Sequence, residues 1–217
     1  MRKAHVAAGT FVLVLSAVVL SAGMGTAPGG RAASVAGHIT GLVPEARVMR
    51  EKKTLVAAKD MGIVLHDEVR TESGGRVRIE LADGSVLNVG SNAQLRILQH
   101  DPARQRTVLE LIYGRLLATA TKISKRGGKF DVRSPIAVAG VVGTKLGLRV
   151  EQEFADVVCK EGTVRVRNTD PSVAGEVVLQ SGEFTHVEVG KPPTPPAQAS
   201  PERIKAGEDA TNIPEAK

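Results

Sequence analysis

The sequence contains very few aromatic residues. They make up 2% of its 217 residues, and there is no Trp and only one Tyr, Tyr113. Proteins that bind single-stranded nucleic acid, and many that bind sugars, stack their ligands on aromatic rings. The composition therefore argues against both of these functions.

Cysteine is nearly absent as well. The single Cys159 cannot form an intramolecular disulfide, and no Cys lies directly after the N-terminal apolar segment, where it could carry a lipid as the first residue of the mature chain. In "DVVCKEG" it alternates with Val157, as residues on one face of a strand do. We expect a small buried thiol at this position rather than a reactive one.

No familiar catalytic or metal-binding pattern is present. Neither a Gly-x-Ser-x-Gly nor a His-Glu-x-x-His motif occurs. The close carboxylate pairs, Asp67 with Glu68 and Glu151 with Glu153, are expected at solvated turns. The histidines past residue 30 lack the paired spacing of metal ligands: His38, His66, His100 and His186. We predict a non-enzymatic protein with no cofactor and no metal site.

The positive charge is too small to indicate a nucleic-acid partner. The formal net charge is +6, and Arg2, Lys3 and Arg31 contribute three of these charges ahead of the predicted domain. The remainder is +3 (6 minus 3), which is a weak electrostatic footprint. We expect no nucleic-acid partner.

Residues 1–33 have the layout of a secretory signal peptide. Two basic residues precede an apolar run from Val6 to Ala22, and small residues follow. Cleavage is expected after Ala22 or further along, towards Ala27 or Ala32. The alternative is an uncleaved anchor, because the run approaches the length that spans about 30 Å of bilayer core. The protein is thus expected in the periplasm or secreted, or else anchored in the inner membrane and facing the periplasm, with a membrane partner only in the anchored case.

Residues 34–190 read as one β domain. In "RVRIELADGSVLNV", Val77, Ile79 and Leu81 face one way, and Asp83 with Gly84 is expected to supply the positive-φ residues of a tight hairpin. Similar short segments recur between turn residues. The pattern predicts an all-β fold of short antiparallel strands, either a two-layer sandwich or a rolled, solenoid-like stack.

Residues 191–217 have a different composition, rich in Pro, Ala and charge. Paired prolines favour extended conformations, so a disordered tail or spacer that does not pack is predicted.

The stretch "IAVAGVVGTKLGLRV" is the most distinctive in the domain. Its spacing differs from that of a phosphate-binding loop, and Lys145 and Arg149 exclude a membrane-dimer face. We predict a strand, a turn and a strand, in which Gly140 and Gly143 permit a backbone that a Cβ would block. Four neighbouring residues are expected to face the core: Val141, Val142, Leu146 and Leu148. A fifth, Thr144, is expected to hydrogen-bond across the turn.

Several segments together resemble the FecR domain. They are "VAGVVGTKLGLRV", "ADVVCKEGTVRVRN" and "VVLQSGEFTHV", preceded by "LHDEVRTESGGRVRIELADGSVLNVGSNAQLRIL". The turn of Gly140, Val141, Gly143 and Thr144 matches the Gly-Val-x-Gly-Thr segment of that family. Val142 stands where the family often has a polar or basic residue, and Leu146 where it often has an aromatic one.

The resemblance implies a domain outside the inner membrane. Founding members transmit iron-citrate signals and also carry a cytoplasmic segment that controls a sigma factor. Only Met1 to His5 precede the apolar run here, so the resemblance gives no support for that sigma-regulatory role.

Two functions remain open at this stage. One is an exported binding or scaffold module for a protein or polymer of the envelope. The other is a membrane-anchored periplasmic relay related to iron-citrate signalling. The sequence identifies no ligand-binding residue for either function.

Overall fold

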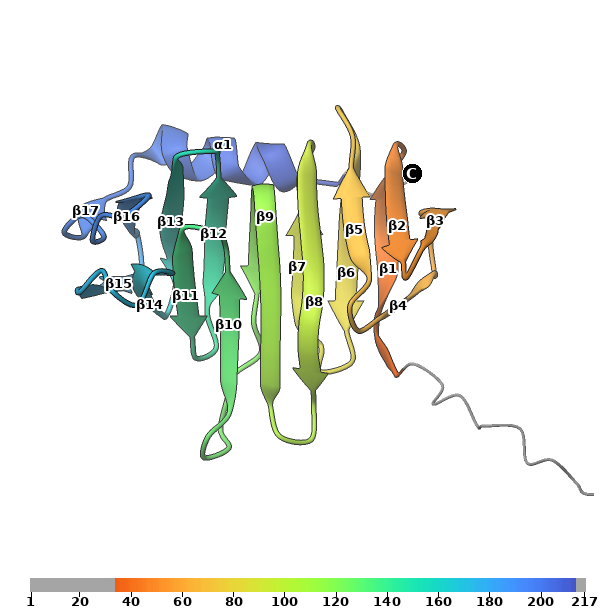
Figure 1. Ribbon diagram of the computed structural model, residues 1–217, viewed down its shortest axis with the longest axis horizontal. Coiled ribbons are helices and arrows are strands. Elements are labelled where there is room, and N and C mark those ends of the chain that lie inside the picture. Colours follow the sequence, from red (N-terminus) through yellow and green to blue (C-terminus); the bar gives the residue numbers. More distant parts are fainter. Residues whose placement is uncertain (1–33, 214–217) are drawn as a thin grey trace, which may run out of the picture. The chain divides into compact units, whose positions relative to one another are not determined.

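The described part of the protein is built from two layers of β-strands (Figure 1). The computed structural model describes residues 34–213, so the signal peptide or anchor predicted for residues 1–33 lies outside the described residues. All strand pairs within them are antiparallel except β9 with β10. The all-β prediction is confirmed.

Layer 1 has the strand order β4-β1-β6-β7-β9-β12-β13-β16-β17. Its strands other than β9 are β1 (Val35–Val43), β4 (Gly62–Val64), β6 (Arg76–Leu81), β7 (Val86–Val89), β12 (Lys145–Val150), β13 (Phe154–Glu161), β16 (Glu183–Glu188) and β17 (Ala197–Gln198).

Layer 2 has the order β3-β2-β5-β8-β9-β10-β11-β14-β15. Its strands other than β9 are β2 (Ala46–Arg50), β3 (Lys53–Val56), β5 (Glu68–Thr71), β8 (Ala93–Asp101), β10 (Lys129–Arg133), β11 (Ala137–Val141), β14 (Thr163–Asn168) and β15 (Glu176–Gln180).

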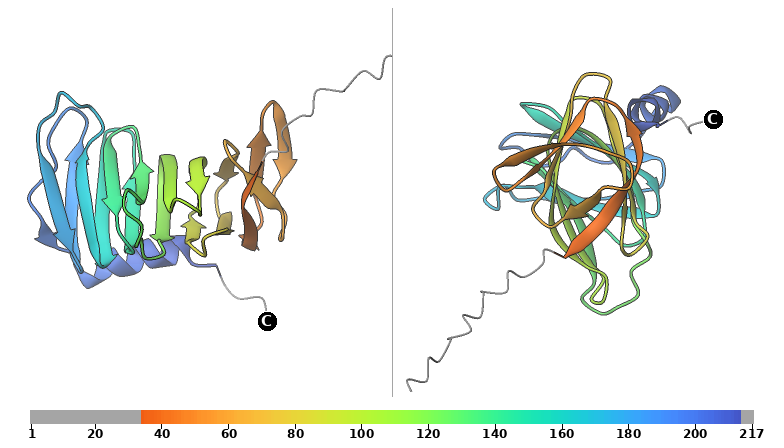
Figure 2. Two further views of the ribbon diagram at one scale, coloured as in Figure 1. Left: turned by 90° about the horizontal axis from the view of Figure 1, so that it is seen from below. Right: turned by 90° about the vertical axis from the view of Figure 1, so that its right-hand side faces the viewer.

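The chain winds between the layers as it advances along the stack (Figure 2). Strands β6 and β7 lie in layer 1, β8 in layer 2, β10 and β11 in layer 2, β12 and β13 in layer 1, and β14 and β15 in layer 2. The structure thus combines the two architectures that the sequence left open, because it is a two-layer stack formed by a rolled, spiral path.

Strand β9 (Arg106–Thr119) is shared by both layers. Its first half pairs with β8 and β10 in layer 2, and its second half with β7 and β12 in layer 1. Gly114 lies at the change of layer with a φ of +93°, and a Cβ there would stand 2.4 Å from Ala93 Cβ. Only glycine fits this position without displacing the neighbouring backbone.

The core lies between the inner faces of the two layers. Alternate residues of each strand point inward, as the period of two in the sequence predicts. The largest side chains of the core are fully buried: Ile39, Ile63, Ile79, Leu87, Leu95, Ile97, Leu109, Leu111, Leu116, Leu146 and Leu179.

One carboxylate pair differs from the sequence prediction. Asp67 and Glu68 are not at a solvated turn, since they are 1% and 7% exposed. Asp67 accepts hydrogen bonds from Arg50 Nε at 2.9 Å and from the Val64 amide at 2.9 Å. Burial acts to raise the pKa of Glu68, but hydrogen bonds and charge from Arg96 and Arg70 outweigh it and lower that pKa. These partners, of which Arg50 and Arg96 come from other strands, make the buried charges tolerable.

The expected C-terminal tail also differs from the structure. Residues 197–198 form β17 against β16, and Pro201–Thr211 form helix α1. Ser200 caps the helix, because its hydroxyl accepts a hydrogen bond from the Arg203 amide at 3.2 Å. Proline at the first helical position is compatible with a helix start, so the proline-rich composition did not exclude a helix.

We expect Gly114→Ala to lower the free energy of unfolding by about 2–3 kcal/mol, because the new Cβ meets both a strained φ and the Ala93 backbone. Gly147→Ala in the paired strand β12 is the control, since the nearest atom to a Cβ there is Val158 Cβ at 3.9 Å. Urea unfolding of the two variants measures the difference. Equal losses would show that β9 tolerates a side chain at its crossing.

Candidate functional site

The hairpin predicted at Asp83 and Gly84 joins β6 to β7. Gly84 has a φ of +80°, as expected, whereas Asp83 is not among the positive-φ residues. Instead, Asp83 Oδ1 accepts a hydrogen bond from the Ser85 amide at 2.9 Å. Asp83 therefore holds the turn through its side chain and not through its φ.

The predicted turn between β11 and β12 depends on Gly143. This residue has a φ of +69°, and a Cβ would stand 2.8 Å from Lys122 Cα. Gly140 lies within β11 with an ordinary φ, and the nearest atom to its Cβ position is Asp131 Oδ1 at 3.4 Å. The special backbone predicted for both glycines is thus required only at Gly143.

The residues around Gly143 mostly serve the fold. The Thr144 hydroxyl donates a hydrogen bond to the Thr163 carbonyl at 3.0 Å, which ties this turn to the start of β14. Val141, Leu146 and Leu148 are buried as expected. Val142 is 64% exposed, so its predicted core position is wrong. It lies at the turn, where the alternation of the strand ends.

We expect Gly143→Val to lower the free energy of unfolding by about 1–3 kcal/mol, because it combines a strained φ with a contact to the Lys122 backbone. Thr144→Val should cost about 1 kcal/mol through the lost hydrogen bond. Gly140→Ala is the matched control and should leave the urea midpoint almost unchanged. A Gly143→Val midpoint equal to that of wild type would contradict the structural role.

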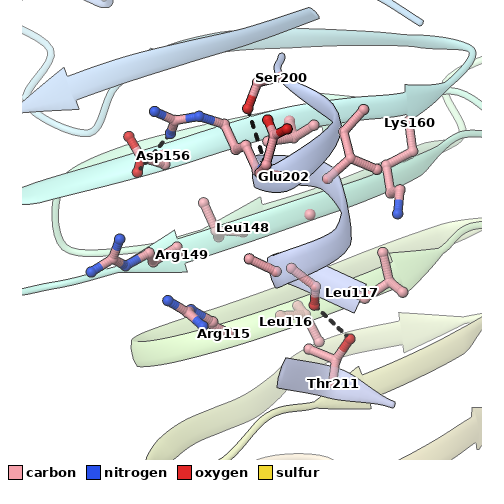
Figure 3. Close-up of a pocket in the computed structure, with 16 residues that line it drawn as sticks. Arg115, Leu116, Leu117, Leu148, Arg149, Asp156, Lys160, Ser200, Glu202 and Thr211 are labelled. Carbon is pink, nitrogen blue, oxygen red and sulfur yellow. Dashed lines mark hydrogen bonds and ion pairs between the residues drawn. The ribbon is translucent and has the colours of Figure 1, made fainter. Parts of the chain in front are cut away.

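The outer face of layer 1 carries a feature that the sequence did not indicate. Helix α1 lies along the stack against this face (Figures 2 and 3). Beneath it, Leu117, Gly147, Val158 and Phe184 lie opposite one another on four successive strands. They form an apolar row across β9, β12, β13 and β16, which we call the apolar row.

A charged row runs beside the apolar row. Arg115 lies opposite Arg149, Arg149 opposite Asp156, and Asp156 opposite His186. Like charges directly opposite each other on neighbouring strands are destabilising. The positive charge of Arg149 is offset by Glu151, whose Oε1 lies 3.0 Å from Arg149 Nε. In contrast, no carboxylate within residues 34–213 forms an ion pair with Arg115.

Polar contacts hold α1 at both of its ends. At the N-terminal end, Arg203 Nη1 lies 3.2 Å from Asp156 Oδ2, and its guanidinium lies 4.1 Å from the centroid of the Phe184 ring. His186 Nδ1 contacts the other oxygen of Asp156 at 2.7 Å. Towards the C-terminal end, Lys160 pairs with Glu208 and lowers its pKa through a hydrogen bond. Arg76 Nε donates to the Ala210 carbonyl at 3.2 Å, which places a cation at the negative end of the helix dipole.

The helix does not fill the space above the apolar row. A cavity of about 420 Å³ lies between them, and its lining includes Leu117, Gly147, Val158, Ile204 and Gly207. Figure 3 shows Arg115 and Arg149 together at one side of this space. We call this space, which is open to solvent on one side, the α1 groove. Its size, and its lining by apolar residues together with charged ones such as Arg115 and Arg149, are typical of a binding site.

The described residues offer neither a metal site nor a reactive thiol. Within residues 34–213 no group of three or more His, Cys, Asp or Glu side chains is placed to hold a metal ion. Cys159 is fully buried, and burial raises the pKa of its thiol to about 11. The expectation of a small buried thiol at this position is confirmed. Glu151 and Glu153 are exposed between β12 and β13, as predicted.

The described residues thus form a two-layer β domain with a helix lying across one outer face. The FecR protein family model matches residues 67–165, from the start of β5 into β14. This part of the chain is a FecR domain, and the resemblance seen in the sequence is confirmed. The match includes the Gly143 turn and three of the four residues of the apolar row.

Two crystal structures of a candidate anti-sigma factor from Parabacteroides distasonis ATCC 8503 have a similar fold. Each aligns with a TM-score of 0.53 and 18% identity over 64% of this chain. The chain spans 62–63% of the length of that protein, and the likeness shows a shared fold. No curated protein sequence matches the chain.

We expect Asp156→Asn to release the N-terminal half of α1, because it removes the carboxylate that Arg203 and His186 share. Amide hydrogen exchange of residues 203–207 should accelerate by at least about fivefold, which corresponds to about 1 kcal/mol. Asp170→Asn is the control, since Asp170 bonds only within its own exposed turn. Unchanged protection of α1 would show that the helix does not depend on this contact.

Proposed function

We propose that the described domain is a non-catalytic relay domain of an envelope signalling system. It binds a protein partner and converts no substrate. The FecR match and the anti-sigma description of the structural neighbours support a signalling role. The scarcity of catalytic groups in the sequence agrees with a protein that acts through contacts.

The observation that carries this proposal is the α1 groove. A relay needs a surface that a partner can enter and leave, and α1 lies on such a surface with polar contacts at its ends and a cavity beneath it. Ile204 is the one large apolar residue within the helix, and it is only partly buried. Within the helix little apolar area contacts layer 1, so separating the helix from layer 1 costs little hydrophobic free energy, while the buried Ile213 beyond its C-terminal end keeps the chain attached beside β1.

The second candidate is an exported binding or scaffold module for an envelope protein or polymer. Arg115 and Arg149 favour it, because cations beside the α1 groove suit an anionic polymer. The two candidates differ in their need for a tether. A relay must stay attached to the inner membrane, whereas a binding module functions free in the periplasm or outside the cell.

Cell fractionation followed by intact mass measurement distinguishes these candidates. For a relay, we expect the full-length mass, with residues 1–22 retained, in the inner-membrane fraction. A shorter mass in the periplasm or medium would contradict the relay and leave the binding module. Among residues 34–213, no helix has the length and hydropathy needed to cross a bilayer.

Photo-crosslinking in cells tests the groove itself. A photoreactive residue at Val158, beneath α1, should capture a protein partner when α1 is loosened by Asp156→Asn. The same residue at the exposed Val178 of β15, in layer 2, is the control. Capture at Val178 but not at Val158 would show that the partner binds elsewhere.

A further inference from the structure

The positive charge of the chain is concentrated in one short segment. Residues 102–129 contain seven Lys and Arg and one acid, Glu110, which gives +6 (7 minus 1). The remaining residues contain 22 basic (29 minus 7) and 22 acidic (23 minus 1) side chains. The segment is therefore strongly basic, and with the two acids that border it, Asp101 and Asp131, residues 101–131 still carry +4 (7 minus 3).

Six of these seven cations lie on two adjacent loops or at their strand ends. One loop joins β8 to β9 and the other joins β9 to β10 (Figure 1). We call this group the basic tip, and it consists of Arg104, Arg106, Lys122, Lys125, Arg126 and Lys129.

Hydrogen bonds join the two loops into one structure. Gln105 Oε1 accepts the amide protons of Ser124 at 3.0 Å and Lys125 at 2.8 Å. Arg106 Nε donates to the Gly127 carbonyl at 2.9 Å, and the Lys125 ammonium donates to the Ala103 carbonyl. The backbone that carries the cations is therefore ordered before any ligand arrives, which lowers the entropic cost of binding.

The charge of the basic tip is only partly neutralised. Arg104 pairs with Asp101 at 3.3 Å, and Lys129 pairs with Asp131 at 3.3 Å. The other four cations have no ion-pair partner within the described residues. An external anion would offset their mutual repulsion.

The basic tip lies at the end of the stack's strands where the chain enters the domain. In layer 1, Gly37 near the start of β1 lies opposite Leu81, and Val86 across the following hairpin lies opposite Thr119. The second loop of the tip begins directly after Thr119 and Ala120. Figure 1 shows the start of β1 and both loops on the same side of the strands, with α1 on the opposite side.

The sequence places this entry point close to the apolar segment. Only residues 23–33 separate Ala22 from the domain, and eleven residues extend at most about 40 Å. If the segment is retained, as the proposed relay requires, the domain is held near the membrane by its basic end. A cationic surface there meets the headgroups of anionic lipids, which attract each nearby Lys or Arg by about 1 kcal/mol.

We propose that the basic tip binds the anionic phospholipid surface of the membrane and so orients the FecR domain, with the α1 groove turned away from the bilayer. The orientation rests on the proposed function, because it requires that the N-terminal apolar segment is retained as a membrane tether. The affinity of the tip for anionic headgroups is a separate property that does not need the tether.

The full chain, reconstituted in lipid nanodiscs, tests the orientation. Ser124→Cys carries a fluorophore on the tip, and Gln152→Cys, in the turn after β12 at the opposite strand end, carries it in the control. Native Cys159 is buried with a raised thiol pKa and resists labelling. A headgroup-attached quencher should quench the tip label in discs containing phosphatidylglycerol, much less in phosphatidylcholine discs, and should leave the control label bright.

Charge removal tests the mechanism. Lys122→Gln, Lys125→Gln and Arg126→Gln together should weaken the association with phosphatidylglycerol by about fivefold per charge, or roughly a hundredfold. High salt should also weaken this association, because it screens the attraction between the cations and the anionic headgroups. The matched control removes three exposed cations elsewhere, by Arg133→Gln, Arg167→Gln and Lys205→Gln, and should keep the quenching.

The possible failures are distinguishable. An anchored chain whose tip label is not quenched, or is quenched equally on neutral discs, overturns the inference and leaves the relay intact. If inorganic phosphate abolishes the tip quenching while sodium chloride at the same ionic strength preserves it, the tip is a general phosphate-binding site, which would overturn the membrane assignment. If fractionation finds a cleaved chain, the relay fails. The mature protein is then mixed with phosphatidylglycerol vesicles, where tip-dependent binding supports the inference and no binding overturns it.

Discussion

The passage of one strand through both layers determines the rest of the structure. Strand β9 pairs with β8 and β10 in layer 2 and then with β7 and β12 in layer 1, and Gly114 makes the change possible. The two layers are therefore held together by a continuous backbone as well as by apolar contact. The loops of the basic tip flank this strand in sequence, and the apolar row includes one of its residues, Leu117. The positions of the basic tip and of the apolar row therefore both depend on where β9 passes from layer 2 to layer 1.

The sequence was most informative where local rules apply. Alternation in "RVRIEL" predicts β6 and its buried face, and Gly84 and Gly143 have the positive φ that their turns need. It failed where distant partners decide the outcome. Asp67 and Glu68 are buried because cations pair with them. Arg50 and Arg96 come from β2 and β8, which no local pattern indicates, whereas Arg70 lies two residues from Glu68 on β5.

The α1 groove could not be predicted for a related reason. Its apolar row takes one residue from each of four strands, so the row exists only after the registers of β9, β12, β13 and β16 are known. Helix α1 lacks a strong apolar face, and its neighbouring prolines resemble those of a spacer. The concentration of charge in residues 102–129, in contrast, was visible in the sequence, but only the structure shows that two loops combine it at one end.

The far end of the helix reaches back to the beginning of the domain. Ile213 is 6% exposed and occupies the space beside Gly41 of β1, after α1 has passed over β13, β12 and β9. The last described residues thus contact the first described strand. The surface that α1 and Ile213 cover is complete only when β1 has paired on one side of β9 and β12 and β13 on the other. Since α1 and Ile213 follow all the strands in sequence, they can dock only on strands that have already paired. A chain truncated before Pro201 would lack the contact that links the last described segment to β1.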